Sequence, residues 1–253
     1  MTSISESKVQ QLTTEGYSFD IGEYIRQAFS LFQKAPGLFI VYAILSGLIS
    51  VSAQLVPLLG SIAAILVSYP ILVGYYLAGH ELSRGREVQL STFFGGFEYF
   101  GNLAAVYLIQ FLAVLAVMIP FVLSVGVSAF IGAELGGEII APAVGIPIML
   151  AMMVPLIYLT VSWMYAPLFV VFNNMGFWDA MEASRKIIHR RWWMVFAFLL
   201  LLGVLMMAGM LALLVGVLVA YPVAMVAVYI SFANVTGLHA ASPEADIVDH
   251  LVE

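Results

Sequence analysis

The sequence FWDAMEASRKIIHRR, residues 177–191, mixes charged and apolar side chains and leads directly into Trp192 and Trp193. From Trp192 the chain contains no Asp, Glu, Lys or Arg until Glu244. Near the end of this apolar run stands LVAYP, residues 218–222. One membrane crossing needs about 20 apolar residues. This stretch therefore predicts an amphipathic segment followed by membrane-spanning helices.

The composition of the whole chain favours the same class of protein. Of the 253 residues, 63% are hydrophobic and 9% are charged, against about 25% charged residues in soluble domains. Too few charges are present to cover so much apolar surface, which indicates a lipid environment. The net charge of −6 argues against nucleic acid as a partner. Cys is absent, which excludes disulfides, thiolate metal sites and a Cys nucleophile.

Four charge-free windows define the predicted crossings: residues 35–80, 99–133, 139–178 and 192–243. The sequence PLLG at 57–60 divides the first window into helices at 38–56 and 61–79. The second and third windows predict one helix each. The last window would be about 70 Å long as one helix, so we expect it to fold back near Ala208 and Gly209. The total is six transmembrane helices.

The basic residues indicate the orientation of these helices. All nine Lys and Arg fall in three places: Lys8, Arg26 and Lys34; Arg84 and Arg86; and Arg185, Lys186, Arg190 and Arg191. With six crossings, all three places lie on one side of the membrane, and the positive-inside rule makes that side cytoplasmic. We therefore expect a multi-pass protein of the bacterial inner membrane, with both termini in the cytoplasm.

A motif recurs in the even-numbered predicted helices. It reads LVSYPI at 66–71, LVAYPV at 218–223 and, more loosely, YAPL at 165–168. We expect its prolines, Pro70, Pro167 and Pro222, to kink their helices. An amphipathic lead-in precedes each odd-numbered helix, at 20–34, 91–99 and 177–191. The predicted fold is thus all-α and integral to the membrane, with three repeats of an interfacial helix and a transmembrane hairpin.

These repeats give the domain organisation. A polar N-terminal segment covers residues 1–18, and it lacks the basic start and apolar run of a cleavable signal peptide. The six-helix membrane domain covers 19–240, with repeats at about 19–86, 90–175 and 177–238. An acidic C-terminal tail covers 241–253.

The lead-in helices are predicted to lie at the depth of the lipid headgroups, with their apolar faces in the acyl boundary. In the first lead-in, that face would hold Ile21, Ile25, Ala28, Phe29 and Phe32. In the third, the interfacial anchors would be Trp178, Arg190, Arg191, Trp192 and Trp193, because Trp and basic side chains favour this depth. Membrane lipid is therefore an expected partner.

A search for reactive groups yields only weak candidates. His80 and Glu81 are adjacent near the end of the second predicted helix, and Glu134 and Glu138 share a glycine-rich outer loop. Packing at a helix end and a solvated loop are the simpler interpretations. An enzyme site would have to use Glu81, Arg84 and His189. We expect no catalytic, cofactor-binding or metal-binding residues, and no enzyme activity.

The fourth predicted helix contains several prolines: Pro142, Pro147, Pro155 and Pro167. A broken helix of this kind forms the substrate site of some transporters. The alternative is a long, tilted and kinked span, because no charged group accompanies the prolines.

Residues 177–229 combine an Asp-, Ala- and Ser-bearing lead-in with an apolar hairpin, a Tyr-Pro pair and the later Tyr229. This pattern resembles poorly characterised bacterial six-helix membrane proteins, a group that includes the membrane domain fused to some glycerophosphodiester phosphodiesterases. The resemblance is one of architecture over residues 19–238. It implies no catalytic residues, because the hydrolase of the fused relatives is a separate soluble domain.

Two functions follow as hypotheses. The first is a non-enzymatic membrane protein that acts through protein–protein or protein–lipid contacts, either as a scaffold or assembly subunit or as a homo-oligomer. The second is a transporter or channel for an apolar or lipid-like substrate through the fourth helix.

Overall fold

The computed structural model describes residues 12, 14, 16–55, 59–135, 140–212 and 215–238, and every regular element among them is a helix. The α-helices are α2 (Ile21–Lys34), α3 (Pro36–Gln54), α4 (Leu59–Ser83), α5 (Leu90–Phe94), α6 (Phe100–Leu135), α7 (Ile140–Ser162), α8 (Ala166–Asn173), α9 (Phe177–Arg190), α10 (Trp192–Leu211) and α11 (Val215–Thr236). A 3₁₀ helix, η1 (Gly95–Tyr99), joins α5 to α6. The predicted all-α class is confirmed over the described residues.

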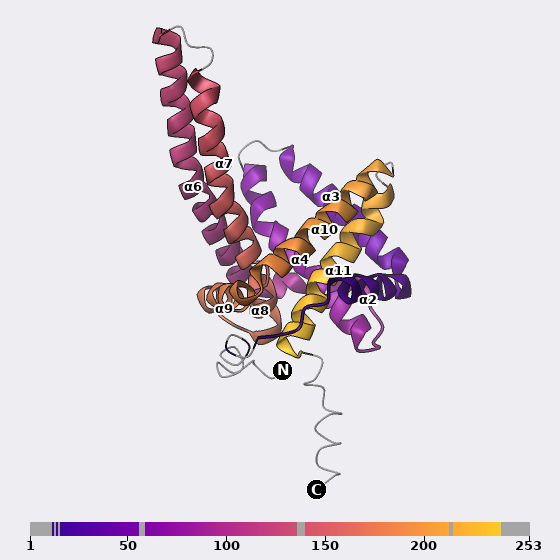
Figure 1. The fold of residues 1–253 in the computed structure, drawn as a ribbon. Coiled ribbons are helices and arrows are strands. Elements are labelled where there is room, and N and C mark those ends of the chain that lie inside the picture. Colours follow the sequence, from indigo (N-terminus) through magenta and orange to yellow (C-terminus); the bar gives the residue numbers. More distant parts are fainter. Residues whose placement is uncertain are drawn as a thin grey trace.

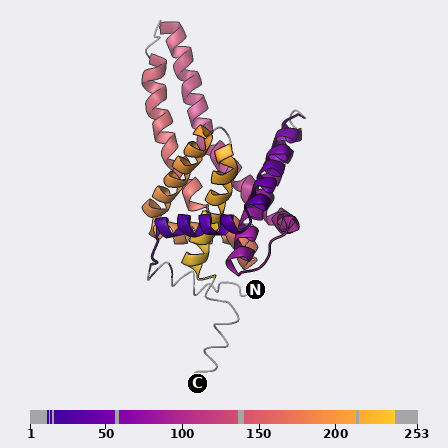
Figure 2. The same ribbon diagram turned by 90° about the vertical axis from the view of Figure 1, so that its right-hand side faces the viewer.

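The long helices form three hairpins, α3–α4, α6–α7 and α10–α11 (Figure 1). Helices α2 and α9 lie across one end of these hairpins in both views (Figures 1 and 2). We call this the basic end, because the described Lys and Arg residues lie on α2, on α9 and its junction with α10, and in the connection from α4 to α5.

Several of these helices meet the length and hydropathy needed to cross a membrane. Among the described residues they are Leu90–Val127, Ile146–Asn173, Trp192–Leu211 and Val215–Thr236. Helices α2 and α3 make a fifth if they count as one span bent by 94°. A membrane-embedded helical protein follows from these four or five candidates. Six crossings remain a prediction, because α4 is not among them.

Helix α11 forms the centre of the bundle, where it contacts α2, α3, α4 and α10. Of its most apolar 18-residue window, 61% is buried inside the protein, against 0% for the window in α5–α6. The core therefore lies around α11, and α6 lies at the periphery.

The amphipathic helices pack against protein, which corrects the prediction that their apolar faces lie in lipid. The buried face of α2 consists of Tyr24, Ala28, Leu31 and Phe32, and α2 packs on α11. Phe29, which was predicted for this face, is 46% exposed. The buried face of α9 consists of Ala180, Met181, Ala183, Ser184, Ile187 and Ile188. An apolar helix face is stabilised by packing on neighbouring helices as well as by entering lipid. The sequence pattern alone does not show which of the two covers the face.

The last apolar window turns later than predicted, because Gly209 lies inside α10 and α11 begins at Val215. A Cβ atom on Gly209 would lie 2.9 Å from the carbonyl oxygen of Gly216, and one on Gly216 would lie 2.5 Å from the carbonyl oxygen of Gly209. These glycines allow α10 and α11 to pack closely, and they do not form the turn.

The fourth predicted helix is also not continuous. Helix α7 ends at Ser162, residues 163–165 form a turn, and α8 continues to Asn173. The single helix predicted within residues 139–178 is therefore interrupted, although Ile146–Asn173 still counts as one candidate span.

A second close approach joins α5 and η1 to α4. A Cβ atom on Gly74 would lie 2.1 Å from the carbonyl oxygen of Phe93, and one on Gly96 would lie 2.2 Å from that of Pro70. A side chain at either position would displace the backbone of the other segment. A Cβ atom on Gly47, in α3, would meet no described atom within 4 Å, so Gly47 offers a matched control.

We expect Gly74→Ala to destabilise the protein by about 3 kcal/mol, since overpacking against backbone has no flexible side chain to absorb it. Gly47→Ala should leave stability unchanged or slightly raised, because Ala favours helix more than Gly does. Thermal unfolding in a mild detergent, followed by intrinsic Trp fluorescence, measures both. Equal midpoints for the two variants would contradict the close contact.

Candidate functional site

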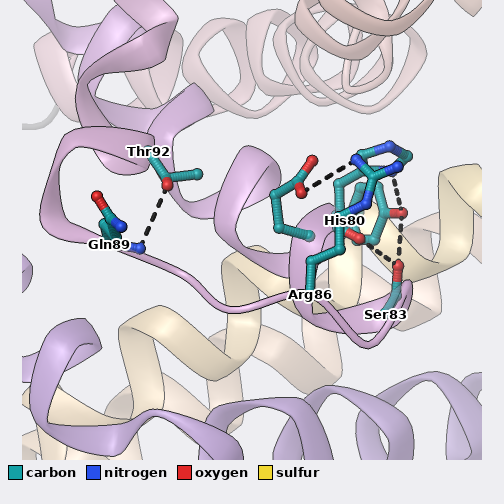
Figure 3. A network of polar contacts seen from close by, with 7 residues as sticks. His80, Ser83, Arg86, Gln89 and Thr92 are labelled. Atoms are coloured by element: carbon teal, nitrogen blue, oxygen red, sulfur yellow. Dashed lines mark hydrogen bonds and ion pairs between the residues drawn. The ribbon is translucent and has the colours of Figure 1, made fainter.

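A buried polar cluster lies at the basic end, where α4 meets α11 (Figure 3). Nδ1 of His80 and the hydroxyl of Tyr229 are 2.8 Å apart. Ser83 Oγ lies 3.2 Å from the same hydroxyl and donates to the carbonyl of His80 at 2.7 Å. His80 and Ser83 are three residues apart on α4, so they share one face of the helix. The Tyr229 hydroxyl thus ties the last turn of α4 to α11.

Apolar groups enclose this cluster. The ring of Phe172, on α8, lies 5.0 Å from the His80 ring and 5.5 Å from the Tyr229 ring. A Cβ on Gly79 would meet the Tyr229 ring at 3.2 Å, so Gly79 allows α11 to approach α4. Hydrogen bonds in such a low-dielectric setting are strong, and breaking one leaves a buried polar group without compensation.

The carboxylate of Glu81, which follows His80 in sequence, pairs with Arg86 at 3.3 Å on the exposed side of α4. The His80–Tyr229 pair can pass a proton between ring and hydroxyl, but this neighbouring carboxylate is committed to an arginine. The cluster is therefore suited first to fixing the positions of α4 and α11.

A second buried network closes the break between α7 and α8. The backbone N–H of Tyr165 donates to Ser184 Oγ at 3.1 Å, and Ser184 Oγ donates to the carbonyl of Ser162 at 2.7 Å. The Tyr165 hydroxyl donates to Ser231 Oγ at 3.0 Å. Side chains from α9 and α11 thus satisfy backbone and hydroxyl groups at the break, as burial in an apolar environment demands.

Two polar side chains, one at the end of α7 and one at the end of α8, have unmet hydrogen-bonding capacity among the described residues. Both amide atoms of Asn173 and the Oγ of Ser162 are buried without a partner. Unpaired buried groups of this kind are costly and uncommon.

The three motif prolines occupy two kinds of position. Pro70 lies inside α4 and Pro222 inside α11. Pro167 lies in the first turn of α8, where the missing N–H costs no helical hydrogen bond.

The predicted anchors gather at the junction of α9 with α10. Trp178 and Trp193 are exposed, while Trp192 is partly buried and stacks on Phe196 at 5.2 Å. Arg190 donates to the carbonyl of Thr14 at 3.1 Å. A groove of about 530 Å³ opens here and is lined by Val154, Tyr158, His189, Arg190, Arg191, Trp192, Trp193 and Met194. We call it the α9–α10 groove.

Two turns earlier on α9, the Glu182 carboxylate is shared by two basic side chains. Arg185 donates to its carboxylate at 2.7 Å and Lys186 lies 3.5 Å from it. The hydrogen bond from Arg185 holds the pKa of the Glu182 carboxyl below its usual value. These charges thus neutralise one another locally.

The acidic pair predicted for the outer loop falls outside the described part of the chain, which includes neither Glu138 nor the side chain of Glu134. Among the described residues, no group of three or more His, Asp or Glu is arranged to hold a metal ion.

No family model matches the chain, and no curated protein or solved structure matches it either. The resemblance to six-helix membrane domains therefore stays a prediction.

Sequence reasoning named His80 but not its contacts with Tyr229 and Ser83. It quoted Ser184 and Tyr229 only as parts of the pattern at 177–229 and predicted no contact for either. Ser83 carried a usable signal, because its spacing from His80 places both on one helix face. The contacts with Tyr229 and Ser184 join residues far apart in sequence, and no local pattern indicates them.

We expect Tyr229→Phe to lower the free energy of unfolding by about 1–2 kcal/mol, since it removes the hydroxyl that His80 and Ser83 share. Tyr221→Phe, two turns earlier on α11, is the control, because its hydroxyl makes no hydrogen bond within the described structure. Trp-fluorescence melting of both variants in detergent measures the difference. A loss as large for Tyr221→Phe would show that the cluster contributes nothing specific.

Proposed function

We propose that this chain is a non-enzymatic, six-span membrane protein that acts through contacts, and that it associates with a second copy of itself through the α6–α7 hairpin. The observation that carries the proposal is the length and exposure of this hairpin. It extends past the tips of the α3–α4 and α10–α11 hairpins in both views (Figures 1 and 2).

The lengths of the helices support this proposal. Helices α10 and α11 have 20 and 22 residues, or about 30 and 33 Å, which matches the hydrocarbon core of about 30 Å. Helix α6 has 36 residues, or about 54 Å. Even a tilt of about 40°, the upper end of the usual range, accommodates only about 26 residues. About ten residues of α6 then lie outside the core.

The part of α6 farthest from the basic end is apolar. Val127 is 58% exposed and Phe130 is 70% exposed. Apolar side chains beyond the hydrocarbon core gain little from lipid, so a protein surface is the favourable cover. A second α6–α7 hairpin offers such a surface with the same length and the same character, and closed symmetric pairs are the commonest assemblies.

The arrangement of charges supports the proposed topology. All three hairpins begin and end at the basic end, so six crossings would place every described Lys and Arg on one side. By the positive-inside rule that side would be the cytoplasm, and the membrane the bacterial inner membrane. Three repeats of lead-in plus hairpin agree with this arrangement.

Crosslinking tests the self-association, because the chain has no Cys of its own. Single Cys replacements at Ile119, Val122, Leu123 and Val127 sample the exposed surface of α6, and Val204 and Met207 sample equally exposed positions on α10. We expect oxidation in native membranes to give disulfide-linked dimers from α6 positions and none from α10.

Dimers from α10 as readily as from α6, or none from α6, would contradict the proposal. A disulfide from α6 to a different polypeptide, identified by mass spectrometry, would replace self-association by a second subunit.

Labelling in intact cells tests the topology. A membrane-impermeant thiol reagent should modify Cys at position 136, which lies outside the described residues, and should modify Glu87→Cys only after the cells are permeabilised. Glu87 is exposed at the basic end. Reaction at both positions in intact cells would overturn the predicted topology, which places them on opposite sides of the membrane.

The transporter hypothesis gains one observation, the break between α7 and α8. The freed backbone groups at that break are, however, taken up by Ser184, so the break has a packing explanation. Contact through the α6–α7 hairpin is the better supported function.

A further inference from the structure

We propose that the α9–α10 groove binds the phosphate headgroup of an anionic phospholipid. This inference does not depend on self-association through α6–α7, because the groove and the exposed surface of α6 involve different residues. The argument rests on two arginines that pair with no described carboxylate, on the N-terminus of α10 and on an apolar wall.

The groove holds cations that no described carboxylate neutralises. Outside the groove, Arg26 pairs with Glu23, Arg86 with Glu81, and Arg185 and Lys186 with Glu182, whereas Lys34 and Arg84 pair with no described carboxylate. Arg190 and Arg191 form no ion pair with any described carboxylate, and Arg190 commits one Nη2 contact to the carbonyl of Thr14. An Arg guanidinium has five N–H donors in a planar fork that matches phosphate oxygens.

Further donors converge on the same place. The N-terminus of α10 lies in the groove and has no side-chain cap, so its positive dipole end is open to an anion. The indole Nε1 of Trp192, which lines the groove, is buried and has no acceptor among the described residues.

The other walls of the groove suit a lipid better than a free ion. Val154, Tyr158 and Met194 supply apolar surface, and Trp193 is 75% exposed beside them. Exposed Trp next to Arg is typical of the headgroup depth of a membrane. Basic grooves between membrane helices at this depth bind anionic headgroups. A headgroup could place its phosphate on Arg190 and Arg191 while its acyl chain follows Val154.

The test uses the full chain purified in neutral detergent. Native mass spectrometry counts phosphatidylglycerol or phosphatidylcholine molecules retained after each is added at the same concentration. We expect the wild type to retain phosphatidylglycerol at least about fivefold better than phosphatidylcholine. The double variant R190Q/R191Q should lower the retention of phosphatidylglycerol by roughly tenfold, because two charges that face the phosphate are removed.

The matched control is R26Q/R84Q, which removes the same charge from exposed positions at the basic end that do not line the groove. It should retain phosphatidylglycerol as the wild type does. R191Q alone is a second variant, since it leaves the contact of Arg190 with Thr14 in place and should still lose severalfold.

Equal retention of the two lipids, or equal loss in R26Q/R84Q, would show charge attraction without a site and would overturn the proposal. A further arm adds inorganic phosphate at millimolar concentration. If phosphate alone raises the melting temperature as much as phosphatidylglycerol does, the groove binds a soluble anion and the lipid assignment is wrong.

Discussion

The packing of α11 against four neighbouring helices is the interaction on which this fold depends. Helix α11 carries no Asp, Glu, Lys or Arg, and it is surrounded by α2, α3, α4 and α10. Small residues make this possible, because Gly209 faces Gly216 with no room for a side chain. Without this close approach, α10 could not reach the surface of α11.

Satisfaction of buried polar groups is the second constraint. The break after Ser162 frees backbone groups in a largely apolar bundle, and Ser184 from α9 accepts one hydrogen bond and donates another there. Tyr229 plays a comparable part between α4 and α11. These side chains explain why α9, amphipathic in sequence, belongs to the protein core on one face.

The molecule consequently presents two different surfaces to its surroundings. The α6–α7 hairpin is an apolar arm that extends past the other hairpins, whereas the basic end carries the charged faces of α2 and α9 (Figure 1). The two proposed contacts, one with a second copy and one with anionic lipid, would use these surfaces separately. Either property can therefore fail without the other.

The sequence by itself determined the helical class, the apolar windows and the grouping of the basic residues, because composition and charge spacing are local properties. It predicted a turn near Ala208 and Gly209, one helix over residues 139–178 and a lipid-facing surface on α2. The structure ends α10 at Leu211, interrupts the fourth span at residues 163–165 and packs α2 on α11, and these differences have one reason. A glycine, a proline or an apolar face favours certain local structures. Its role in the fold depends on which other segment packs against it. Only the tertiary structure brought Gly216 to Gly209, Ser184 to the break after Ser162, and α11 to the apolar face of α2.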